Sequence, residues 1–173
     1  MQALTFWKTV TMDKANFLEA LIARLEENGF AYCVIGGQGV NAYVEPLVSL
    51  DLDIVIAFEQ LERAESVLSE HFRMERFPHS LNLSLPGSEL RVQIQTDPRY
   101  RDFVGRASQR EVLGVRLPVA SVEDVLQGKI WAALEPGRRP SKRRKDLLDI
   151  ERLIEAHPHL SSGVPREILD RLQ

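Results

Sequence analysis

The chain has 173 residues, of which 44% are hydrophobic and 27% charged, with a formal net charge of −3. This length and composition suit a globular protein with a core of its own and exclude a disordered chain, and the small net charge gives no overall attraction to nucleic acid or anionic membranes. A single cysteine, Cys33, excludes an intrachain disulfide framework. With neither a signal-peptide pattern nor an apolar run near the ~20 residues of a membrane span, we expect a cytoplasmic protein without membrane contact.

The first predicted element is a helix over residues 11–28. Apolar residues recur there at helical spacing, and Gly29 follows as a C-terminal glycine. Thr11 or Asp13 is the expected N-cap. We expect this helix to support the first strand and to carry no chemistry.

A short apolar strand is predicted over residues 32–35 and is followed by Gly36 and Gly37. Glycine permits a sharp turn and leaves backbone amides uncovered, so that a phosphate can approach closely. A simple tight turn is the alternative interpretation, and the two are compatible. A short helix is expected over residues 38–43.

The second strand, predicted over residues 50–57, begins with two acidic residues. Because side chains alternate along a strand, Asp51 and Asp53 share one face while Leu52 and Ile54 share the other. Two carboxylates in an apolar strand are costly to bury without a counter-ion, and Mg²⁺ prefers such oxygen ligands. The alternative is a pair of solvent-facing acids, against which the apolar run after them argues.

The middle of the chain predicts a helix and a hairpin. Residues 59–72 form an amphipathic helix with a charged outer face. Strict alternation over residues 81–85 and again over 90–95, with Pro-Gly-Ser between them, predicts two antiparallel strands.

The next segment predicts irregular structure and one more strand. Residues 98–109 are expected to form a short helix or loop, and residues 112–119 a strand. Gly114 and Pro118 indicate that this strand is bent or lies at a sheet edge.

Helices are predicted for the rest of the chain. Ser121 opens a capping box and a helix to about residue 134, Ser141 is expected to cap a long helix to about Ala156, and residues 165–172 form a tail helix. No linker is long enough to divide the chain. We therefore predict a single domain over residues 1–173, with a core over about 30–119 and C-terminal helices over about 121–173.

Three segments together resemble the nucleotidyltransferase superfamily. They are VIGGQGVNAY (34–43), SLDLDIVI (49–56) and GKIWAALEPGRRPSKRRKDLLDIERL (128–153). They are most similar to its small bacterial branch, which includes the AbiEii-type toxin nucleotidyltransferases, and the likeness covers about residues 30–153. It implies an α/β (α+β) fold, in which a mixed sheet has helices mainly on one face and a C-terminal helical segment.

The resemblance also implies an activity, the transfer of a nucleoside monophosphate from an NTP to an acceptor hydroxyl or phosphate with release of pyrophosphate. In this interpretation Asp51 and Asp53 are catalytic and bind Mg²⁺ or Mn²⁺. The nucleotide-binding residues would be Gly36, Gly37, Ser49, Lys129 and Lys145. The acceptor stays open between an RNA end, a protein side chain and a small molecule such as an antibiotic.

Several charged residues near the C-terminus have a second interpretation. Lys129 could be a solvated helical lysine, and the basic run over residues 138–145 could be a solvated loop rather than an anion or RNA surface. Asp146 and Asp149 could pair locally with Arg143 or Lys145. The resemblance instead implies that both acids orient basic residues at the active site.

Two positions depart from the family pattern. Gln93 occupies the third position, where an acid is expected, and an amide cannot act as a general base at neutral pH. Asp97 could substitute only if the chain bends before Pro98. Leu47 stands where the branch often carries arginine. These departures motivate the alternatives of a catalytically silent nucleotide- or RNA-binding module and of a toxin–antitoxin component that acts through a partner surface.

Overall fold

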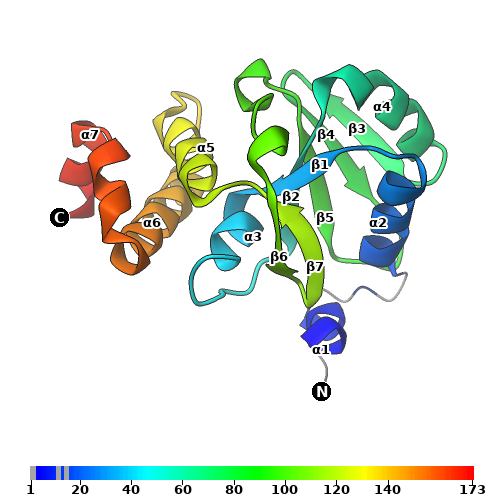
Figure 1. Ribbon diagram of the computed structural model, residues 1–173, viewed down its shortest axis with the longest axis horizontal. Helices are drawn as coiled ribbons and strands as arrows, with labels where there is room; N and C mark the ends of the chain where they lie inside the picture. The colour runs from blue at the N-terminus through cyan, green and yellow to red at the C-terminus, as the bar shows by residue number, and fades with distance from the viewer. Residues whose placement is uncertain (1–2, 11–12, 14–15) are drawn as a thin grey trace.

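A mixed β-sheet with helices on both sides forms the centre of the molecule (Figure 1). The computed structural model describes residues 3–10, 13 and 16–173. The strands are β1 (Tyr32–Ile35), β2 (Asp51–Ile56), β3 (Arg73–Phe77), β4 (Ser80–Ser84), β5 (Arg91–Gln95), β6 (Ser108–Val112) and β7 (Val115–Val119). Their order in the sheet is β3-β4-β5-β2-β1-β7-β6, and β2–β5 and β1–β7 are the parallel pairs. The predicted mixed-sheet fold class is confirmed.

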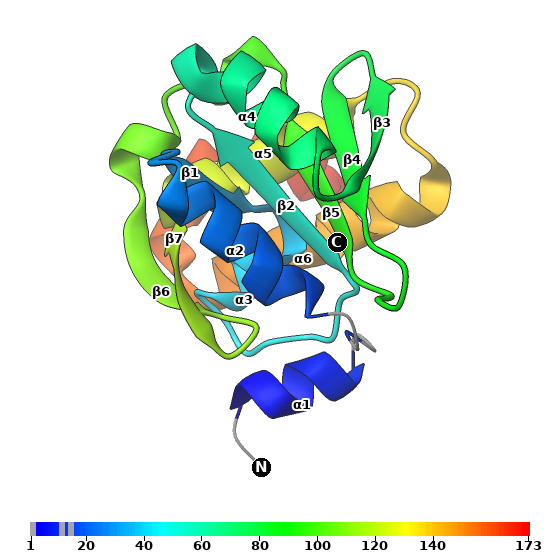
Figure 2. The same cartoon turned by 90° about the vertical axis from the view of Figure 1, so that its right-hand side faces the viewer.

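The helices lie on both faces of this sheet (Figure 2). They are α1 (Ala3–Val10), α2 (Phe17–Glu27), α3 (Gly36–Asn41), α4 (Leu61–Ser69), α5 (Val122–Leu134), α6 (Pro140–Ala156) and α7 (Arg166–Leu169). Short 3-10 turns occupy Phe58–Gln60, Pro98–Tyr100, Val104–Arg106, Pro158–Gly163 and Asp170–Leu172. We expected the helices mainly on one face, but α2 and α4 pack on one face while α3, α5 and α6 pack on the other. The expected C-terminal helical segment is present.

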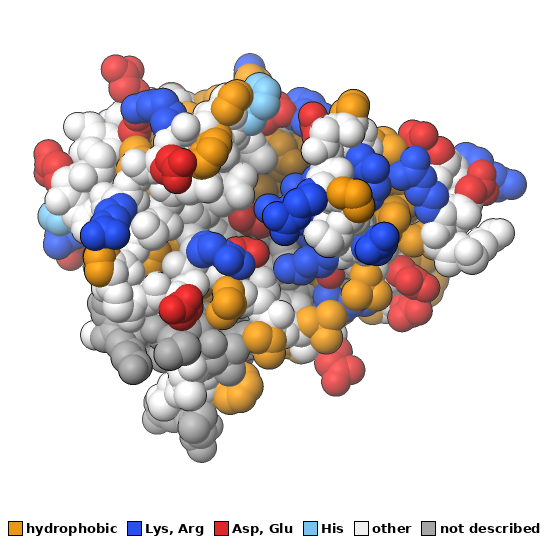
Figure 3. Space-filling view, turned by 180° about the vertical axis from the view of Figure 1, so that it is seen from behind, with side chains coloured by type: hydrophobic (Ala, Val, Ile, Leu, Met, Phe, Trp, Pro, Cys, Tyr) orange, Lys and Arg blue, Asp and Glu red, His pale blue; other side chains and the backbone are white. Residues whose placement is uncertain are grey.

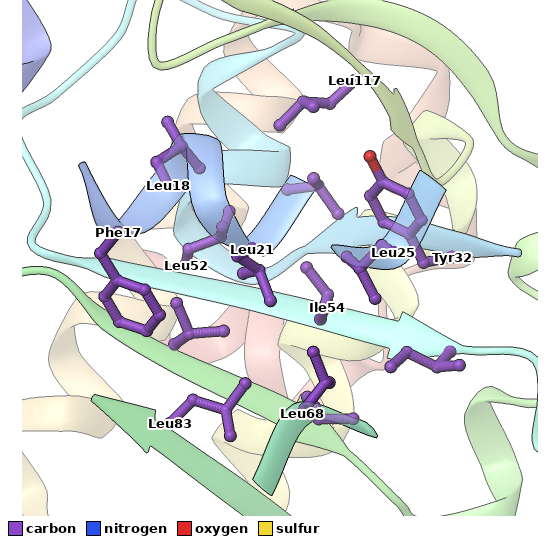
Figure 4. Close-up of a cluster of buried hydrophobic side chains, with 14 of the residues drawn as sticks. Phe17, Leu18, Leu21, Leu25, Tyr32, Leu52, Ile54, Leu68, Leu83 and Leu117 are labelled. Atoms are coloured by element: carbon purple, nitrogen blue, oxygen red, sulfur yellow. The ribbon is translucent and has the colours of Figure 1, made fainter. Parts of the chain in front are cut away.

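Alternation along β2 separates two hydrophobic cores. Leu52, Ile54 and Ile56 point into the core beneath α2 and α4, where they meet side chains such as Phe17 and Leu68 (Figure 4). Val55 points into the second core with residues of α5 and α6. Asp51 and Asp53 therefore belong to the second face, in the first half of β2, where they are only half-buried.

The N-terminus of α2 is capped by Asp13, which precedes the first residue of the helix by four positions. The carboxylate of Asp13 accepts hydrogen bonds from the backbone amides of Phe17 at 2.7 Å and Leu18 at 3.1 Å. The cap expected at Thr11 lies outside the described residues. At the other end Gly29 follows the helix with φ of +68°, as its position after the apolar pattern predicts.

The hairpin predicted for the middle of the chain is confirmed, because β4 pairs antiparallel with β5. The sequence did not indicate β3, which pairs antiparallel with β4 and forms one edge of the sheet. Most side chains of β3 are exposed and several are charged, so the strand lacks the alternation of apolar and polar residues that would predict it.

The strand predicted over residues 112–119 requires a correction. Leu113 and Gly114, with φ of +53° and +81°, form a turn between β6 and β7. Gly114 therefore separates two strands rather than bending one. Pro118 is not at an edge either, since β7 lies between β1 and β6.

The two long C-terminal helices begin differently. The Ser121 hydroxyl accepts a hydrogen bond from the Asp124 amide at 3.1 Å, so the predicted cap of α5 is confirmed. The prediction that Ser141 caps α6 is wrong, because α6 begins at Pro140 after Arg139. Proline suits this first helical position, where its missing N–H costs nothing. Across the described part of the chain, no helix combines the length and apolar character needed to cross a bilayer.

Candidate active site

One cleft of about 770 Å³ brings the sequence-predicted site residues together. Its floor is the second face of the sheet, and its wall is formed by α5, α6 and the segment between them. The predicted residues among its lining are Gly36, Gly37, Ser49, Asp51, Asp53, Gln93, Lys129 and Lys145. Figure 3 shows Lys and Arg side chains gathered around a hollow on this side of the molecule, with acidic side chains inside it.

Strand register places the two acids at the centre of the floor. Asp53 lies opposite Ile35 of β1 on one side and Gln93 of β5 on the other. Asp51 is paired with Arg91, whose Nε donates to Asp51 Oδ1 at 2.7 Å. Since Gly36 directly follows Ile35 at the end of β1, the glycine turn and Gln93 flank Asp53 from opposite sides.

Gly36 is in direct contact with the Asp53 carboxyl group. A Cβ at Gly36 would lie 2.3 Å from Asp53 Oδ2, and the residue has φ of +67°, which side chains other than glycine rarely adopt. A Cβ at Gly37 would lie 4.0 Å from Lys145 Nζ. Bare backbone thus separates the acids of β2 from a lysine of α6.

The environment of Asp53 favours a bound cation. Burial raises the pKa of the Asp53 carboxyl to about 6, and Asp51 adds to this effect, while Lys129, Lys145 and Arg138 oppose it. None of the ion pairs formed among the described residues includes Asp53.

The donor set at this point suits a hard divalent cation. Within the described residues there is no cluster of three or more His, Cys, Asp or Glu side chains that could hold a metal ion. The available oxygens are those of Asp51 and Asp53, with the Gln93 amide beside them in the sheet. Mg²⁺ commonly binds through one or two carboxylates and keeps water or substrate phosphates as its other ligands, so these residues fit it.

Lys129 is buried in a network of ion pairs behind this floor. Its Nζ lies 3.1 Å from Asp146 Oδ1 and 2.9 Å from Asp149 Oδ2. Burial opposes the charged form, but Asp149, Asp146 and Asp53 outweigh it and raise the lysine pKa. Arg138 donates to both carboxylate oxygens of Asp146, at 2.8 and 3.1 Å.

Asp146 and Asp149 do not pair with Arg143 or Lys145, the local partners considered from the sequence. Arg143 instead donates to the carbonyl oxygens of Ala133 at 3.0 Å and Glu135 at 2.6 Å, where it caps the end of α5. Asp146 pairs with Lys129 of α5 and with Arg138 of the segment after α5, while Asp149 pairs with Lys129 and with Arg152 of its own helix.

A chain of hydrogen bonds that sequence reasoning missed joins α6 to α3. Arg152 lies 2.8 Å from Asp149 Oδ1, and its Nη2 donates to the Glu45 carbonyl at 2.6 Å and to Asn41 Oδ1 at 3.2 Å. Asn41 also donates to the Leu47 carbonyl at 2.7 Å. The sequence signal for this network is limited to two amide residues, Gln38 and Asn41, three apart in α3.

The same network reaches Ser49 and Asp51. Gln38, which is buried, donates to the Ser49 carbonyl at 3.2 Å, and the Ser49 hydroxyl accepts from the Asp51 amide at 3.2 Å. The loop between α3 and β2 is therefore fixed from both sides. Leu47, where the resemblance implies an arginine, has an exposed side chain that does not line the cleft.

Asp97 does not replace the missing third acid. It accepts hydrogen bonds from the amide of Arg99 at 2.9 Å and from its Nε at 3.0 Å, and so caps the 3-10 turn at Pro98–Tyr100. It is not among the residues that line the cleft. Gln93 lies beside Asp53 in the sheet, at the place where the resemblance implies a third acid.

Comparison with known proteins supplies the family. The family model described as nucleotidyl transferase AbiEii toxin, type IV TA system, matches residues 42–171, which is more than half of the chain. The chain belongs to the AbiEii nucleotidyltransferase family. No curated protein matches it significantly in sequence.

Solved structures share the fold of this AbiEii-family chain at low sequence identity. ANT(2'')-Ia, solved with adenylyl-2''-tobramycin, is 14% identical with a TM-score of 0.56, over 87% of this chain and 98% of that chain. The lincosamide antibiotic adenylyltransferase LnuA, lincomycin-bound, is 16% identical with a TM-score of 0.55, over 80% and 95%. An antigenic nucleotidyltransferase-like protein from Paracoccidioides brasiliensis is 19% identical with a TM-score of 0.53, over 84% and 77%.

The cleft of this AbiEii-family protein is cationic although the chain as a whole is acidic. Among the described residues, seven Lys and Arg side chains and four Asp and Glu side chains line it. They are Arg73, Arg91, Lys129, Arg138, Arg139, Lys142 and Lys145, against Asp51, Asp53, Glu75 and Asp146. Such a concentration of positive charge favours polyanionic ligands.

Proposed function

We propose that this protein transfers a nucleoside monophosphate from an NTP to an acceptor oxygen and releases pyrophosphate. The observation that carries the proposal is the meeting of two strand carboxylates, Asp51 and Asp53, with the bare glycine turn and a basic wall in one cleft. Membership of the AbiEii family and the shared adenylyltransferase fold support it.

The triphosphate is assigned to the side of the cleft formed by α3 and α6. Gly36 and Gly37 leave room for phosphate oxygens, and the Ser49 hydroxyl lies at the start of the acidic strand. Lys145 reaches the same place from α6 and is exposed, so its charge is available to a ligand. A lysine ammonium suits this position as a compact cation.

Asp51 and Asp53 would hold Mg²⁺ or Mn²⁺. A divalent cation there would supply Lewis-acid stabilisation of charge on the transferring phosphoryl group. The chain's own contribution is to keep both carboxylates ionised and correctly placed. Lys129 supports this from beneath, because its positive charge, itself held by Asp146 and Asp149, lowers the pKa of Asp53.

A catalytically silent nucleotide- or RNA-binding module of the same fold is the second candidate. The observation in its favour is Gln93, which lies directly beside Asp53 without offering a base. Such a module would bind NTP with Mg²⁺ and release no pyrophosphate.

Nucleotide binding and turnover separate the two candidates. We expect the protein with Mn²⁺ and each NTP to bind nucleotide in calorimetry and to release pyrophosphate when an acceptor is present. The double variant Asp51→Asn with Asp53→Asn should lose both, while Asp170→Asn, an exposed acid of the C-terminal tail, should lose neither. Binding without release, in which Gln93→Asp restores release, would establish the silent module instead.

The family description also leads us to propose a toxin–antitoxin context. The exposed surfaces of α6 and α7 would then meet a partner protein. Co-expression with the product of the neighbouring gene and size-exclusion chromatography should give a complex, and elution of the chain alone would contradict this context.

A further inference from the structure

Beyond Asp53, the floor of the cleft continues through two uncharged amide side chains, Gln93 and Asn82, and ends at the acidic Glu75. Strand register places Asp53 beside Gln93, Gln93 beside Asn82, and Asn82 beside Glu75 at the sheet edge. All four line the cleft. The Asn82 Oδ1 is buried and has no hydrogen-bond partner among the described residues, so the floor retains a polar group that a ligand could satisfy.

A second row, one pleat further along the same face, is cationic. It begins with Asp51 beside Arg91, continues to Ser84 of β4, which is one residue past the Leu83–Val92 pair, and ends with Arg73, which lies beside Ser84. Arg73, Ser84 and Arg91 are exposed and line the cleft. Two strand spacings separate the two arginines, about 10 Å between their backbones, and the serine hydroxyl lies between them.

This arrangement suits a phosphate group. Guanidinium groups bind phosphate through paired N–H donors, and a hydroxyl adds one more. Only Nε of Arg91 is tied to Asp51 at 2.7 Å, which leaves its terminal nitrogens for a ligand. The row lies across β2 from Gly36 and Gly37, so it is separate from the place assigned to the triphosphate.

Gln93 restricts what kind of acceptor can react. A hydroxyl acceptor must lose a proton as it attacks, and an amide at this position cannot take it. A phosphate monoester has a second pKa near 6, so at neutral pH its oxygens are already ionised. An acceptor of this class needs no base from the protein.

We propose that the acceptor is a phosphate monoester held by Arg73, Ser84 and Arg91 beside Gln93, and that its phosphate oxygen is the nucleophile. The inference rests on the proposed function. An acceptor oxygen bonds to the α-phosphorus of the NTP, and the bond from that phosphorus to the bridging oxygen of the β-phosphate breaks. Its electron pair leaves with pyrophosphate, and the product contains a new P–O–P linkage. With inorganic phosphate the reaction converts NTP to NDP and pyrophosphate.

The test offers matched acceptors with and without the phosphate. The protein, Mn²⁺ and α-³²P-labelled NTP are incubated with inorganic phosphate, glycerol 3-phosphate, glycerol, and an RNA oligonucleotide carrying either a 5′-phosphate or only hydroxyl ends. We expect labelled NDP from inorganic phosphate and a labelled adduct with glycerol 3-phosphate, at least about tenfold faster than with glycerol. Transfer to the 5′-phosphate RNA in place of the small phosphates would identify a nucleic-acid source of the same chemistry.

Variants on one strand separate the phosphate site from general surface charge. Arg73→Ala should raise the KM for the phosphate acceptor by about 10- to 100-fold and leave the KM for NTP unchanged. Arg76→Ala is the matched control, because Arg76 lies on the opposite face of β3 and pairs with Glu65. Calorimetry with inorganic phosphate and a non-hydrolysable NTP gives a readout that does not depend on turnover, and the phosphate binding should be lost only in Arg73→Ala.

The outcomes distinguish this proposal from the proposed function. Wild-type transfer to glycerol or to RNA 3′-hydroxyls in preference to phosphates would overturn the phosphate acceptor and leave nucleotidyl transfer standing. Absence of transfer to every acceptor from bound Mn²⁺–NTP would overturn both. Gln93→Glu should shift the preference toward hydroxyl acceptors, and a preference unchanged in that variant would contradict the role assigned to Gln93.

Discussion

The two faces of β2 differ in what they contribute to the molecule. On one face Leu52, Ile54 and Ile56 are at most 2% exposed and hold the sheet against α2 and α4. On the other face Asp51 and Asp53 lie in the cleft, where burial raises the Asp53 pKa. Residues that alternate along one strand therefore have two roles. Those on one face stabilise the fold, and those on the other face carry an unfavourable charge that a bound cation can compensate. Substitutions on each face should separate stability from activity.

The largest effect is expected from Asp53→Asn on turnover. The amide keeps the shape of the side chain but removes the charge that would hold a divalent cation. We expect kcat/KM for pyrophosphate release to fall by about 1000-fold or more, near 4 kcal/mol of transition-state stabilisation. A variant that retains a tenth of wild-type activity would contradict the assignment of Asp53.

On the opposite face, Ile56→Ala should act on stability alone. Ile56 is fully buried in the core under α2 and α4, and truncation leaves a cavity. We expect the free energy of unfolding in urea to fall by about 3 kcal/mol. Mn²⁺ affinity measured on the folded variant at low temperature should match the wild type, and a clear loss of affinity would show that the two faces are not independent.

The same Asp53→Asn substitution should stabilise the protein when no metal is bound. The folded pKa of about 6 exceeds the ordinary value of 3.8, so the folded state binds the proton more tightly than the unfolded state. Wild-type stability therefore decreases as pH rises from about 4 to 6. With chelator at pH 8, we expect the free energy of unfolding of Asp53→Asn to exceed that of the wild type by about 2 kcal/mol. Near pH 4 this difference should vanish. If the variant and the wild type were equally stable at both pH values, the Asp53 carboxylate would not be desolvated in the folded protein.

The smallest effect separates the two glycines. Gly36→Ala places a Cβ against the Asp53 carboxylate and forces alanine into a left-handed conformation, which should cost about 1–2 kcal/mol of stability. A Cβ at Gly37 would make only an ordinary contact with Lys145 Nζ at 4.0 Å and its φ is ordinary, so the unfolding free energy of Gly37→Ala should stay within about 0.5 kcal/mol of wild type. Thermal denaturation of both variants provides the measurement. Equal losses would remove the special role of Gly36.

Local patterns in the sequence were sufficient to predict the elements in which apolar residues recur at a fixed period. The alternation around Asp51 and Asp53 gave the correct shared face, and the hairpin of β4 and β5 followed from the same rule. β3 was not predicted because its residues facing the cleft include charged ones, which leaves no regular alternation of apolar residues. The turn at Leu113 escaped because a positive φ at leucine has no sequence signature.

Long-range polar contacts explain what could not be predicted at the candidate site. Asp146 has basic neighbours one helical turn away, yet the burial of its face of α6 selects Lys129 and Arg138 instead, while Asp149 pairs both with Lys129 and with Arg152 of its own helix. Arg152 donates to a backbone carbonyl 107 positions earlier in the chain, and every residue type offers such a carbonyl.

The bridge from Arg152 to Asn41 and Glu45 makes the C-terminal helices part of the machinery near β2. A small displacement of α6, which also lines the cleft, would pull on the segment that ends at Ser49. A truncation before α6 would remove Lys145 and would also release this segment. A partner bound to the outer surface of α6 is therefore connected to Asp51 and Asp53 through this chain of hydrogen bonds.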